Sequence, residues 1–341
     1  MFGHCFAVMF VLTVPLAFAG EADIILPDLT KVTFNIFGST VGGVSIMYFG
    51  IIVCLIGLIF SIFQANHTKG LPTHKAMLDV SEIIWETCKS YLAQQGKFLL
   101  GLWILIAICM IYYFMGLSHM AIGGMLVILL SSILGILGSY GVAWFGMRIN
   151  TWANSRTAFT SLTGKPVEVV NIPLTSGMSV GLLLVSVELF FMICILVFLP
   201  KELVGPSFIG FAIGESLGAS ALRIAGGIFT KIADIGSDLM KIVFKLPEDD
   251  PKNPGVIADC TGDNAGDSVG PTADGFETYG VTGVALIAFL ALALAMNPIM
   301  SGTLIIWIFA MRILMILTSL ISYYINKGIT SSVYGSKTKF D

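Results

Sequence analysis

Acidic residues gather in one short stretch of an otherwise apolar chain. Ten of the 21 aspartates and glutamates lie between Asp234 and Glu277, where the flanking sequence is apolar enough to cross a membrane. An ionisable side chain inside a span is costly and indicates a functional site. Carboxylate oxygens suit Mg²⁺, and a lysine beside bound metal ions suits a polyanionic phosphate. The stretch therefore favours either phosphate chemistry or a simple cation pathway lined by acids.

The spacing of these residues places them on single helix faces. At about 100° per residue, the charged residues of each of two successive helices fall within an arc of about 80°. The earlier helix carries Arg223, Lys231, Asp234 and Asp238, and the later one carries Asp259, Asp263, Asp267, Asp274 and Glu277. Lipid cannot solvate such stripes, so they must face the bundle interior or water.

Depth along the two helices predicts which charges meet. Arg223 is 17 residues from Met240, and Asp274 is 18 residues from Val256. Both therefore lie roughly 25 Å from the helix ends that adjoin the loop 241–255. If the helices are antiparallel neighbours, Arg223 lies beside Asp274 and Glu277. The other acids of the two stripes, Asp234, Asp238, Asp259, Asp263 and Asp267, then form a vestibule nearer the loop, and this vestibule contains Lys231.

Composition identifies the elements that must hold these groups. Apolar residues make up 56% of the 341 residues and charged residues only 11%, which excludes a disordered chain and argues against a soluble one. The net charge of −3 gives no basic face for nucleic acid. No strand pattern or phosphate-binding glycine loop is found. We predict an all-α protein, a polytopic transmembrane helix bundle with about seven spans and an N-terminal signal-like segment.

The predicted domains follow from the apolar runs. Residues 1–19 are expected to be a signal peptide or anchor, residues 20–325 a transmembrane domain, and residues 326–341 a cytoplasmic tail. The expected spans are 41–63, 98–118, 120–147, 174–199, 207–240, 256–296 and 299–325. The loop 64–97 has a partly amphipathic pattern, and we expect it to form a helix on the protein or membrane surface.

Lysine and arginine set the orientation. The loops 64–97, 148–173 and 241–255 and the tail 326–341 hold thirteen of the 18 basic residues, whereas the opposite side holds only Lys31 and Lys201. The positive-inside rule therefore places the basic loops in the cytoplasm. Glu188 and Arg312 lie inside spans, away from the stripes. We expect Glu188 to be buried and satisfied, and Arg312 to pair with a neighbour or to extend toward the interface.

Four motifs resemble the membrane-integral pyrophosphatases, which use pyrophosphate hydrolysis to pump H⁺ or Na⁺. They are GGIFTKIADIGSDL at 226–239, PEDDPKNP at 247–254, GDNAGD at 262–267 and ADGFE at 273–277. The similarity is long, ordered and specific. It implies a pyrophosphate-energised ion pump, that is, a membrane-bound inorganic diphosphatase coupled to cation translocation, in the cell (inner) membrane with its substrate site facing the cytoplasm.

The resemblance also implies roles for individual residues. Lys231, Asp263 and Asp267 would be catalytic, with Asp267 helping to orient the attacking water. Arg223, Asp274 and Glu277 would form the ion gate. The Mg-pyrophosphate would lie among Asp234, Asp238, Glu248, Asp259, Asp263 and Asp267, with Asp234, Asp238, Asp263 and Asp267 as metal ligands. Mg²⁺ is the implied cofactor, with K⁺ as an additional activator. The position of Glu277 favours Na⁺ as the transported ion, with H⁺ as the alternative.

The same resemblance covers only the first half of the family's pattern. It implies a homodimer and a C-terminal half that supplies further aspartates and lysines to the site, so we expect this chain to be inactive alone. Two other functions stay open on the sequence. One is a carboxylate-lined cation channel or secondary transporter, and the other is a non-catalytic remnant.

Overall fold

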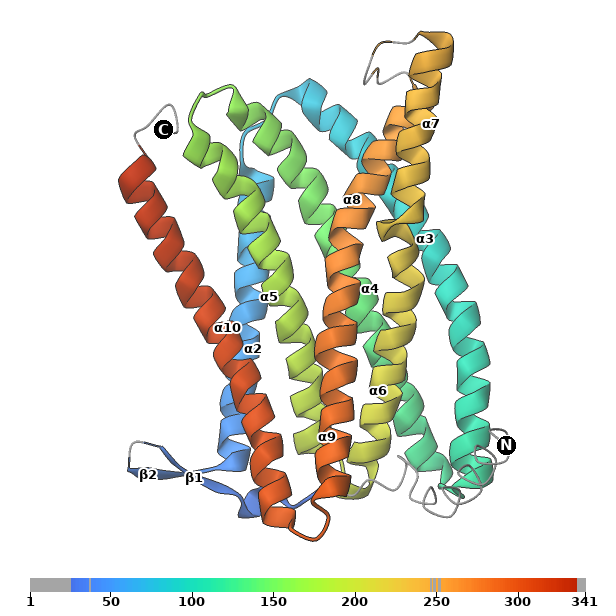
Figure 1. The fold of residues 1–341 in the computed structure, drawn as a ribbon, viewed down its shortest axis with the longest axis vertical. Helices are drawn as coiled ribbons and strands as arrows, with labels where there is room; N and C mark the ends of the chain where they lie inside the picture. The colour runs from blue at the N-terminus through green and yellow to red at the C-terminus, as the bar shows by residue number, and fades with distance from the viewer. Residues whose placement is uncertain (1–25, 37, 246, 248–249, 251–252, 336–341) are drawn as a thin grey trace, which may run out of the picture.

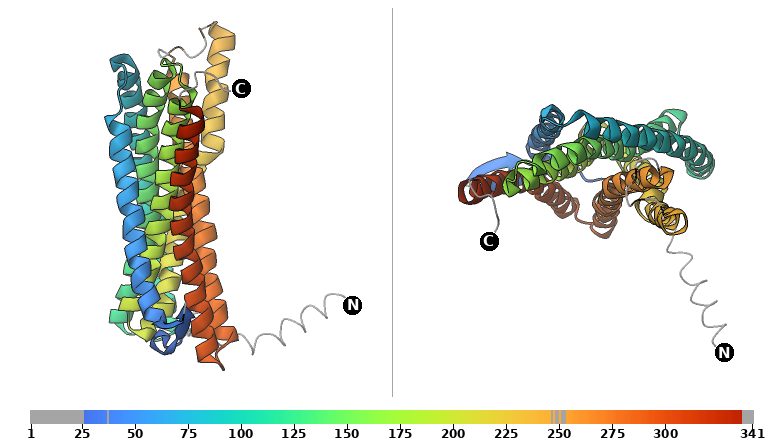
Figure 2. Two further views of the ribbon diagram at one scale, coloured as in Figure 1. Left: turned by 90° about the vertical axis from the view of Figure 1, so that its left-hand side faces the viewer. Right: turned by 90° about the horizontal axis from the view of Figure 1, so that it is seen from above.

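The computed structural model describes residues 26–36, 38–245, 247, 250 and 253–335. These form a helical bundle whose long axes run side by side, broad in Figure 1 and narrow in the side view of Figure 2. The expected segment 1–19 and residues 336–341 of the expected tail lie outside the described residues. The prediction of an all-α bundle with several membrane spans is confirmed.

Seven helical segments correspond to the seven predicted spans. In chain order, the elements are α2 (Gly43–Gly70), α3 (Lys75–Ile111) with a π-helical turn (Tyr112–Leu117), α4 (Ile122–Ser161), α5 (Pro166–Phe198), α6 (Lys201–Leu222), a 3₁₀ turn (Arg223–Gly226), α7 (Ile228–Phe244), α8 (Pro254–Gly275), a π-helical segment (Phe276–Val281), α9 (Thr282–Ala293) and α10 (Pro298–Tyr334). Among the described residues, six segments are long and apolar enough to cross a membrane. The seventh, α6 to α7, is interrupted and carries the earlier charged stripe.

The ends of the helices agree with the predicted alternation across the membrane. The α2–α3 and α4–α5 connections, the end of α7 and the start of α8 all lie at the upper end of Figure 1, where α10 also ends. The first hairpin and the α9–α10 connection lie at the opposite end. The segments expected in the cytoplasm therefore share one end of the molecule.

Small residues bring α4 and α6 into backbone contact. A Cβ added to Gly210 would lie 2.7 Å from the carbonyl oxygen of Ile128, and one added to Gly214 would collide with the carbonyl oxygen of Ser132. A Cβ added to Gly135 of α4 would likewise collide with the carbonyl oxygen of Phe211. Glycine and serine at a helix crossing permit this approach, which replaces side-chain burial by dense backbone packing.

The loop expected over 64–97 is not a separate surface helix. The chain turns at residues 71–74, and α3 then runs without interruption into the next span. The helical prediction was right, but its setting was wrong, because Trp85, Cys88 and Leu92 are buried against α4 and α8. One side of this segment is a contact between helices, whereas its apolar residues Val80 and Ile83 stay exposed.

A short β-hairpin precedes the bundle, which the sequence pattern did not predict. Strands β1 (Thr33–Ile36) and β2 (Ser39–Gly42) pair antiparallel, with Thr33 opposite Gly42. Gly38 adopts a φ of +85° at the turn, a conformation that glycine reaches without strain. The strands are only four residues long, so their alternation is too brief to stand out.

Candidate functional site

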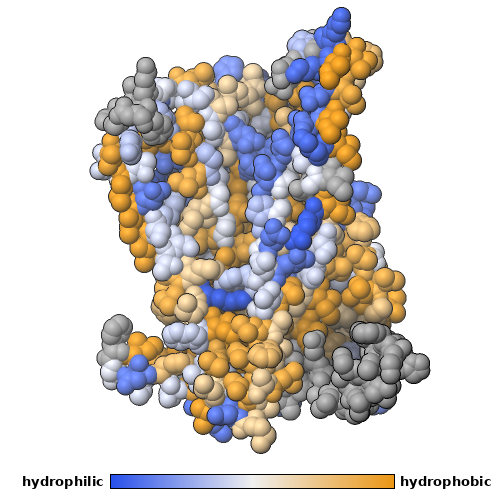
Figure 3. All heavy atoms as spheres, viewed as in Figure 1, coloured by the Kyte–Doolittle hydropathy of each residue, from blue (hydrophilic) through white to orange (hydrophobic). Residues whose placement is uncertain are grey.

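The polar face of the bundle lies over α7 and α8. Figure 3 shows hydrophilic residues running down this face with hydrophobic residues beside them. The two helices pack directly against each other, and Gly262 of α8 makes this possible, since a Cβ there would lie 2.8 Å from the Cα of Thr230. The first glycine of the GDNAGD motif thus brings the two charged stripes together.

The structure joins Arg223 to both acids that depth predicted. Its Nη2 donates to Asp274 Oδ1 at 2.5 Å and to Glu277 Oε2 at 2.6 Å. Arg223 begins the 3₁₀ turn after α6, and Glu277 lies in the π-helical segment after α8. Both charged helices therefore leave regular α-helical geometry at the depth where they meet. Periodicity treated each as a continuous helix, so these interruptions were not predicted.

A second group of contacts lies nearer the end expected in the cytoplasm. Lys231 Nζ donates to Asp234 Oδ2 at 2.6 Å, and the hydroxyl of Thr230 donates to Asp263 Oδ1 at 2.8 Å. Both Lys231 and Asp234 are substantially exposed, with side-chain exposures of 69% and 42%. Lys231 is also attracted to the charges of Asp238 and Asp259. This gives one cation among several carboxylates.

The remaining predicted residues follow the same two helices. Asp238 is exposed on α7, Asp267 is exposed on α8, and Asp259 is half-buried on α8. Glu248 lies outside the described residues. Among those described, no three His, Cys, Asp or Glu side chains come close enough to hold a metal ion. The four expected metal ligands are therefore not gathered into one site made of protein atoms alone.

This donor set nevertheless fits Mg²⁺. Magnesium usually keeps several waters and is bound through one or two carboxylates together with substrate phosphates. Exposed carboxylates on facing helices, such as Asp234 on α7 and Asp263 on α8, match that requirement. Lys231, which donates to Asp234, would supply the positive charge that a phosphate requires.

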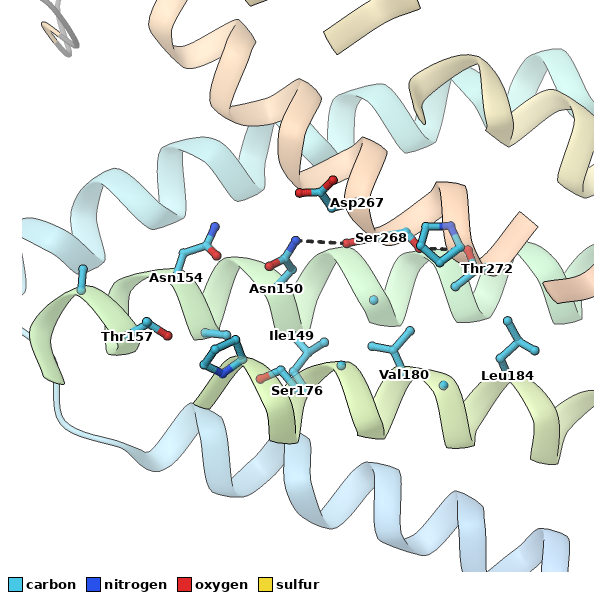
Figure 4. A pocket seen from close by; sticks show the side chains of 17 residues that line it. Ile149, Asn150, Asn154, Thr157, Ser176, Val180, Leu184, Asp267, Ser268 and Thr272 are labelled. Atoms are coloured by element: carbon cyan, nitrogen blue, oxygen red, sulfur yellow. Dashed lines mark hydrogen bonds between the residues drawn. The ribbon is translucent and has the colours of Figure 1, made fainter. Parts of the chain in front are cut away.

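A cavity of about 710 Å³ opens beside Asp267, between α4, α5 and α8. Figure 4 shows Asp267, Asn150 and Asn154 along one side of it, opposite the apolar Val180 and Leu184. Asn150 Nδ2 donates to Ser268 Oγ at 3.3 Å, and Asn154 Nδ2 donates to Asn264 Oδ1 at 2.7 Å.

The two asparagines of α4 thus fix the face of α8 that carries Asp267. Sequence reasoning did not assign them a role. Asn154 lies in the run Ala153–Thr157, which weakly resembles the pyrophosphatases and could have indicated a role for it, whereas Asn150 lies outside that run.

The comparisons with known proteins identify the family. A model of the inorganic H⁺ pyrophosphatases matches residues 55–340. The chain belongs to this family. A curated relative from Chlorobaculum tepidum, named a K⁺-insensitive pyrophosphate-energized proton pump, is 63% identical over 288 residues, which cover 84% of this chain and 38% of the relative.

Two further relatives carry the same name. One from Pyrobaculum aerophilum is 34% identical over 74% of this chain and 35% of its own length. One from Methanosarcina mazei is 31% identical over 73% of this chain and 37% of its own length. The chain therefore spans less than half the length of these members of the H⁺ pyrophosphatase family. Their names describe pumps that K⁺ does not affect, which gives no support to K⁺ as an activator.

Proposed function

We propose that this chain is the N-terminal part of a membrane pump that hydrolyses pyrophosphate and uses the free energy to move protons. The observation that carries the proposal is the network of Arg223, Asp274 and Glu277 below a carboxylate vestibule on the same two helices. A cation channel needs the acids but has no use for a lysine among them. The family and the names of its relatives support the pump over the channel or transporter.

The residues of the vestibule have distinct proposed roles. Lys231 binds a phosphate group of the substrate. To do so, it gives up its exposed contact with Asp234. Asp267 holds and orients the attacking water, and Asp263 and Asp259 line the phosphate site from α8. Asp234, Asp238, Asp263 and Asp267 would hold Mg²⁺ jointly with the substrate. When bound, Mg²⁺ neutralises phosphate charge and favours departure of the leaving group.

Proton transfer is assigned to the deeper network. Arg223 pairs with Asp274 and Glu277 at a place where lipid would not solvate their charges. If Arg223 moves away, the two carboxylates lose its positive charge, and binding a proton becomes more favourable for them. The location of Glu277 initially favoured Na⁺. The relatives are named proton pumps, which supports the alternative, H⁺.

The proposed site needs more protein than this chain offers. Arg223 is 46% exposed and Asp274 is 70% exposed, although both lie within the part of the bundle expected to be in the membrane. We infer that the remainder of the pump, corresponding to the rest of the relatives' length, covers α7 and α8 and adds charged groups. Losing one group that stabilises the transition state costs about 100- to 1,000-fold in rate. The chain alone is therefore expected to be inactive.

A chimera tests the proposal. This chain is joined to the part of the Chlorobaculum tepidum relative beyond the matched region and placed in inverted membrane vesicles. We expect Mg²⁺-dependent pyrophosphate hydrolysis with proton uptake, no hydrolysis by the chain alone, and loss of both activities in Asp267→Ala. Asp79→Asn, at an exposed position on α3, is the matched control and should change neither.

Three results would contradict the proposal. Hydrolysis by the chain alone at the rate of the chimera would show that copies of this chain complete the site. Hydrolysis with Na⁺ uptake and no proton uptake would overturn the choice of ion. Full activity of the Asp267→Ala chimera would remove the assigned water-orienting role.

A further inference from the structure

A second group of charged side chains lies inside the bundle, away from the vestibule. Glu188 of α5 and Glu215 of α6 are both 0% exposed, and Arg312 of α10 forms an ion pair with Glu188. Arg312 Nη1 lies 3.4 Å from Glu188 Oε1, and its Nη2 donates to the carbonyl oxygen of Tyr279. The sequence predicted a buried and satisfied Glu188; its burial is confirmed, but its Oε2 has no hydrogen-bond partner.

The two carboxylates converge on one point of the chain. A Cβ at Gly280 would collide with Glu215 Oε2 and would lie 2.9 Å from Glu188 Oε1. Only a glycine leaves room for both groups here. Gly280 belongs to the π-helical segment that also contains Glu277. One short segment therefore contributes both to this cluster and to the Arg223 network. π-Helical turns are frequently found at functional sites.

The hydrogen bonding of the cluster is incomplete. Glu188 Oε2 and both oxygens of Glu215 are buried with no hydrogen-bond partner, and the same is true of the Tyr279 hydroxyl. The Arg312 guanidinium lies 3.9 Å from the centre of the Tyr279 ring, which keeps its charge beside the two acids. The buried Cys54 thiol of α2 is the other titratable group acting on Tyr279.

Charge counting shows what is missing. With both carboxyl groups ionised, one guanidinium faces two negative charges, and an unpaired buried charge is strongly unfavourable. One additional positive charge would make the cluster neutral. Within the described residues there is no group of three acidic, histidine or cysteine side chains for a metal ion, whereas a proton needs only two oxygens between which to form a hydrogen bond.

We propose that Glu188 and Glu215 form an internal proton-binding site, in which Glu215 carries the proton and Arg312 is the fixed counter-charge of Glu188. The ligand is a proton bound between two carboxyl groups, at a place separate from the Arg223 network. The proposal concerns proton binding by this chain and does not depend on pyrophosphate hydrolysis.

Infrared spectroscopy of the full chain in lipid nanodiscs tests the proposal. A protonated carboxyl group gives a C=O stretching band that shifts on transfer to D₂O and is distinct from carboxylate bands. We expect this band in the wild type at neutral pH and its loss in Glu215→Gln. Glu202→Gln changes an exposed acid on the same helix and should keep the band.

A second variant and a second measurement keep the test decisive. Glu188→Gln leaves one carboxylate for Arg312, so no proton is needed and the band should also be lost, even if Glu215→Gln fails to fold. The melting temperature of the wild type should not depend on replacing choline by Na⁺. A band that persists in both variants, or a Na⁺-dependent rise in melting temperature that Glu215→Gln abolishes, would overturn the proposal, the latter in favour of a Na⁺ site.

Discussion

The guanidinium of Arg223 lies 2.5 Å from the carboxylate of Asp274, 51 residues later in the chain. The contact joins the break after α6 to the last turns of α8, so it ties the two interrupted segments together at one depth. Because Glu277 shares the same guanidinium, a movement of either helix must alter the charge balance of all three groups.

The Arg223–Asp274 contact is expected to contribute little to the stability of this chain alone. A double-mutant cycle with Arg223→Gln and Asp274→Asn should give a coupling free energy of about 0–1 kcal/mol, because both side chains are largely uncovered by the rest of this chain. Thermal unfolding in detergent measures it. The exposed pair Lys89 and Glu86 on α3 is the matched control and should give a similar value. A coupling above about 2 kcal/mol would show that the Arg223 pair is shielded from water.

The glycine contact between α4 and α6 should tolerate no added methyl group. Gly135→Ala places a Cβ against backbone atoms of α6, including Glu215 N at 2.8 Å, so we expect a loss of about 1–3 kcal/mol in unfolding free energy. Gly141→Ala on the same helix meets nothing within 4 Å and should be neutral or stabilising by up to about 1 kcal/mol. Equal melting temperatures for the two variants would contradict the crossing as described.

Asp28 should make stability depend on pH at the end of the molecule opposite the vestibule. The Lys201 ammonium, 2.8 Å away, and the Thr30 hydroxyl hold the pKa of Asp28 well below its ordinary value of 3.8. A lowered pKa in the folded state means that the contribution is complete above the unfolded pKa and is lost as the pH falls below it. Asp28→Asn should therefore lower the melting temperature at about pH 6 and have less effect at about pH 3. An equal effect at both pH values would count against the Lys201 contact.

The orientation of the bundle can be measured with single cysteines. In a variant whose six native cysteines are replaced, Lys165→Cys in the α4–α5 connection should react with an impermeant maleimide only from the cytoplasmic side. Lys201→Cys, at the start of α6, should react only from the other side. The positive-inside rule is the reason for this expectation. The reverse pattern of labelling would place the vestibule outside the cell.

The sequence predicted contacts correctly where the charged residues of each helix lie on one face of that helix. The arcs of charge and their depth predicted the contacts of Arg223 with Asp274 and Glu277, because residue type and helical rise alone determine them. The cluster around Gly280 could not be predicted in this way. Its three charged members come from α5, α6 and α10, each is the isolated acid or base of an apolar run, and only tertiary packing shows that they meet.

The interruptions of the charged helices were missed for a related reason. Periodicity assumes one constant turn angle, whereas the 3₁₀ turn at Arg223 and the π-helical segment at Phe276 change that angle locally. The error did not displace the Arg223–Asp274 contact, since both residues lie at or before the interruption on their own helix. Because of the same error, the sequence did not predict that Gly280 lies against Glu188 and Glu215.

The length of α4 has a consequence for how membrane voltage would act on the proposed pump. Its 40 residues span about 60 Å, roughly twice the thickness of the hydrocarbon core. Excess length at the end expected in the cytoplasm would place Lys231, Asp234 and Asp263, and with them the proposed phosphate chemistry, outside most of the electric field. A proton that passes the deeper acids crosses that field, at about 2.3 kcal/mol for each 100 mV. In the proposed pump, the membrane voltage would therefore oppose proton movement directly. It would affect hydrolysis only indirectly, through the helices that connect the two sites.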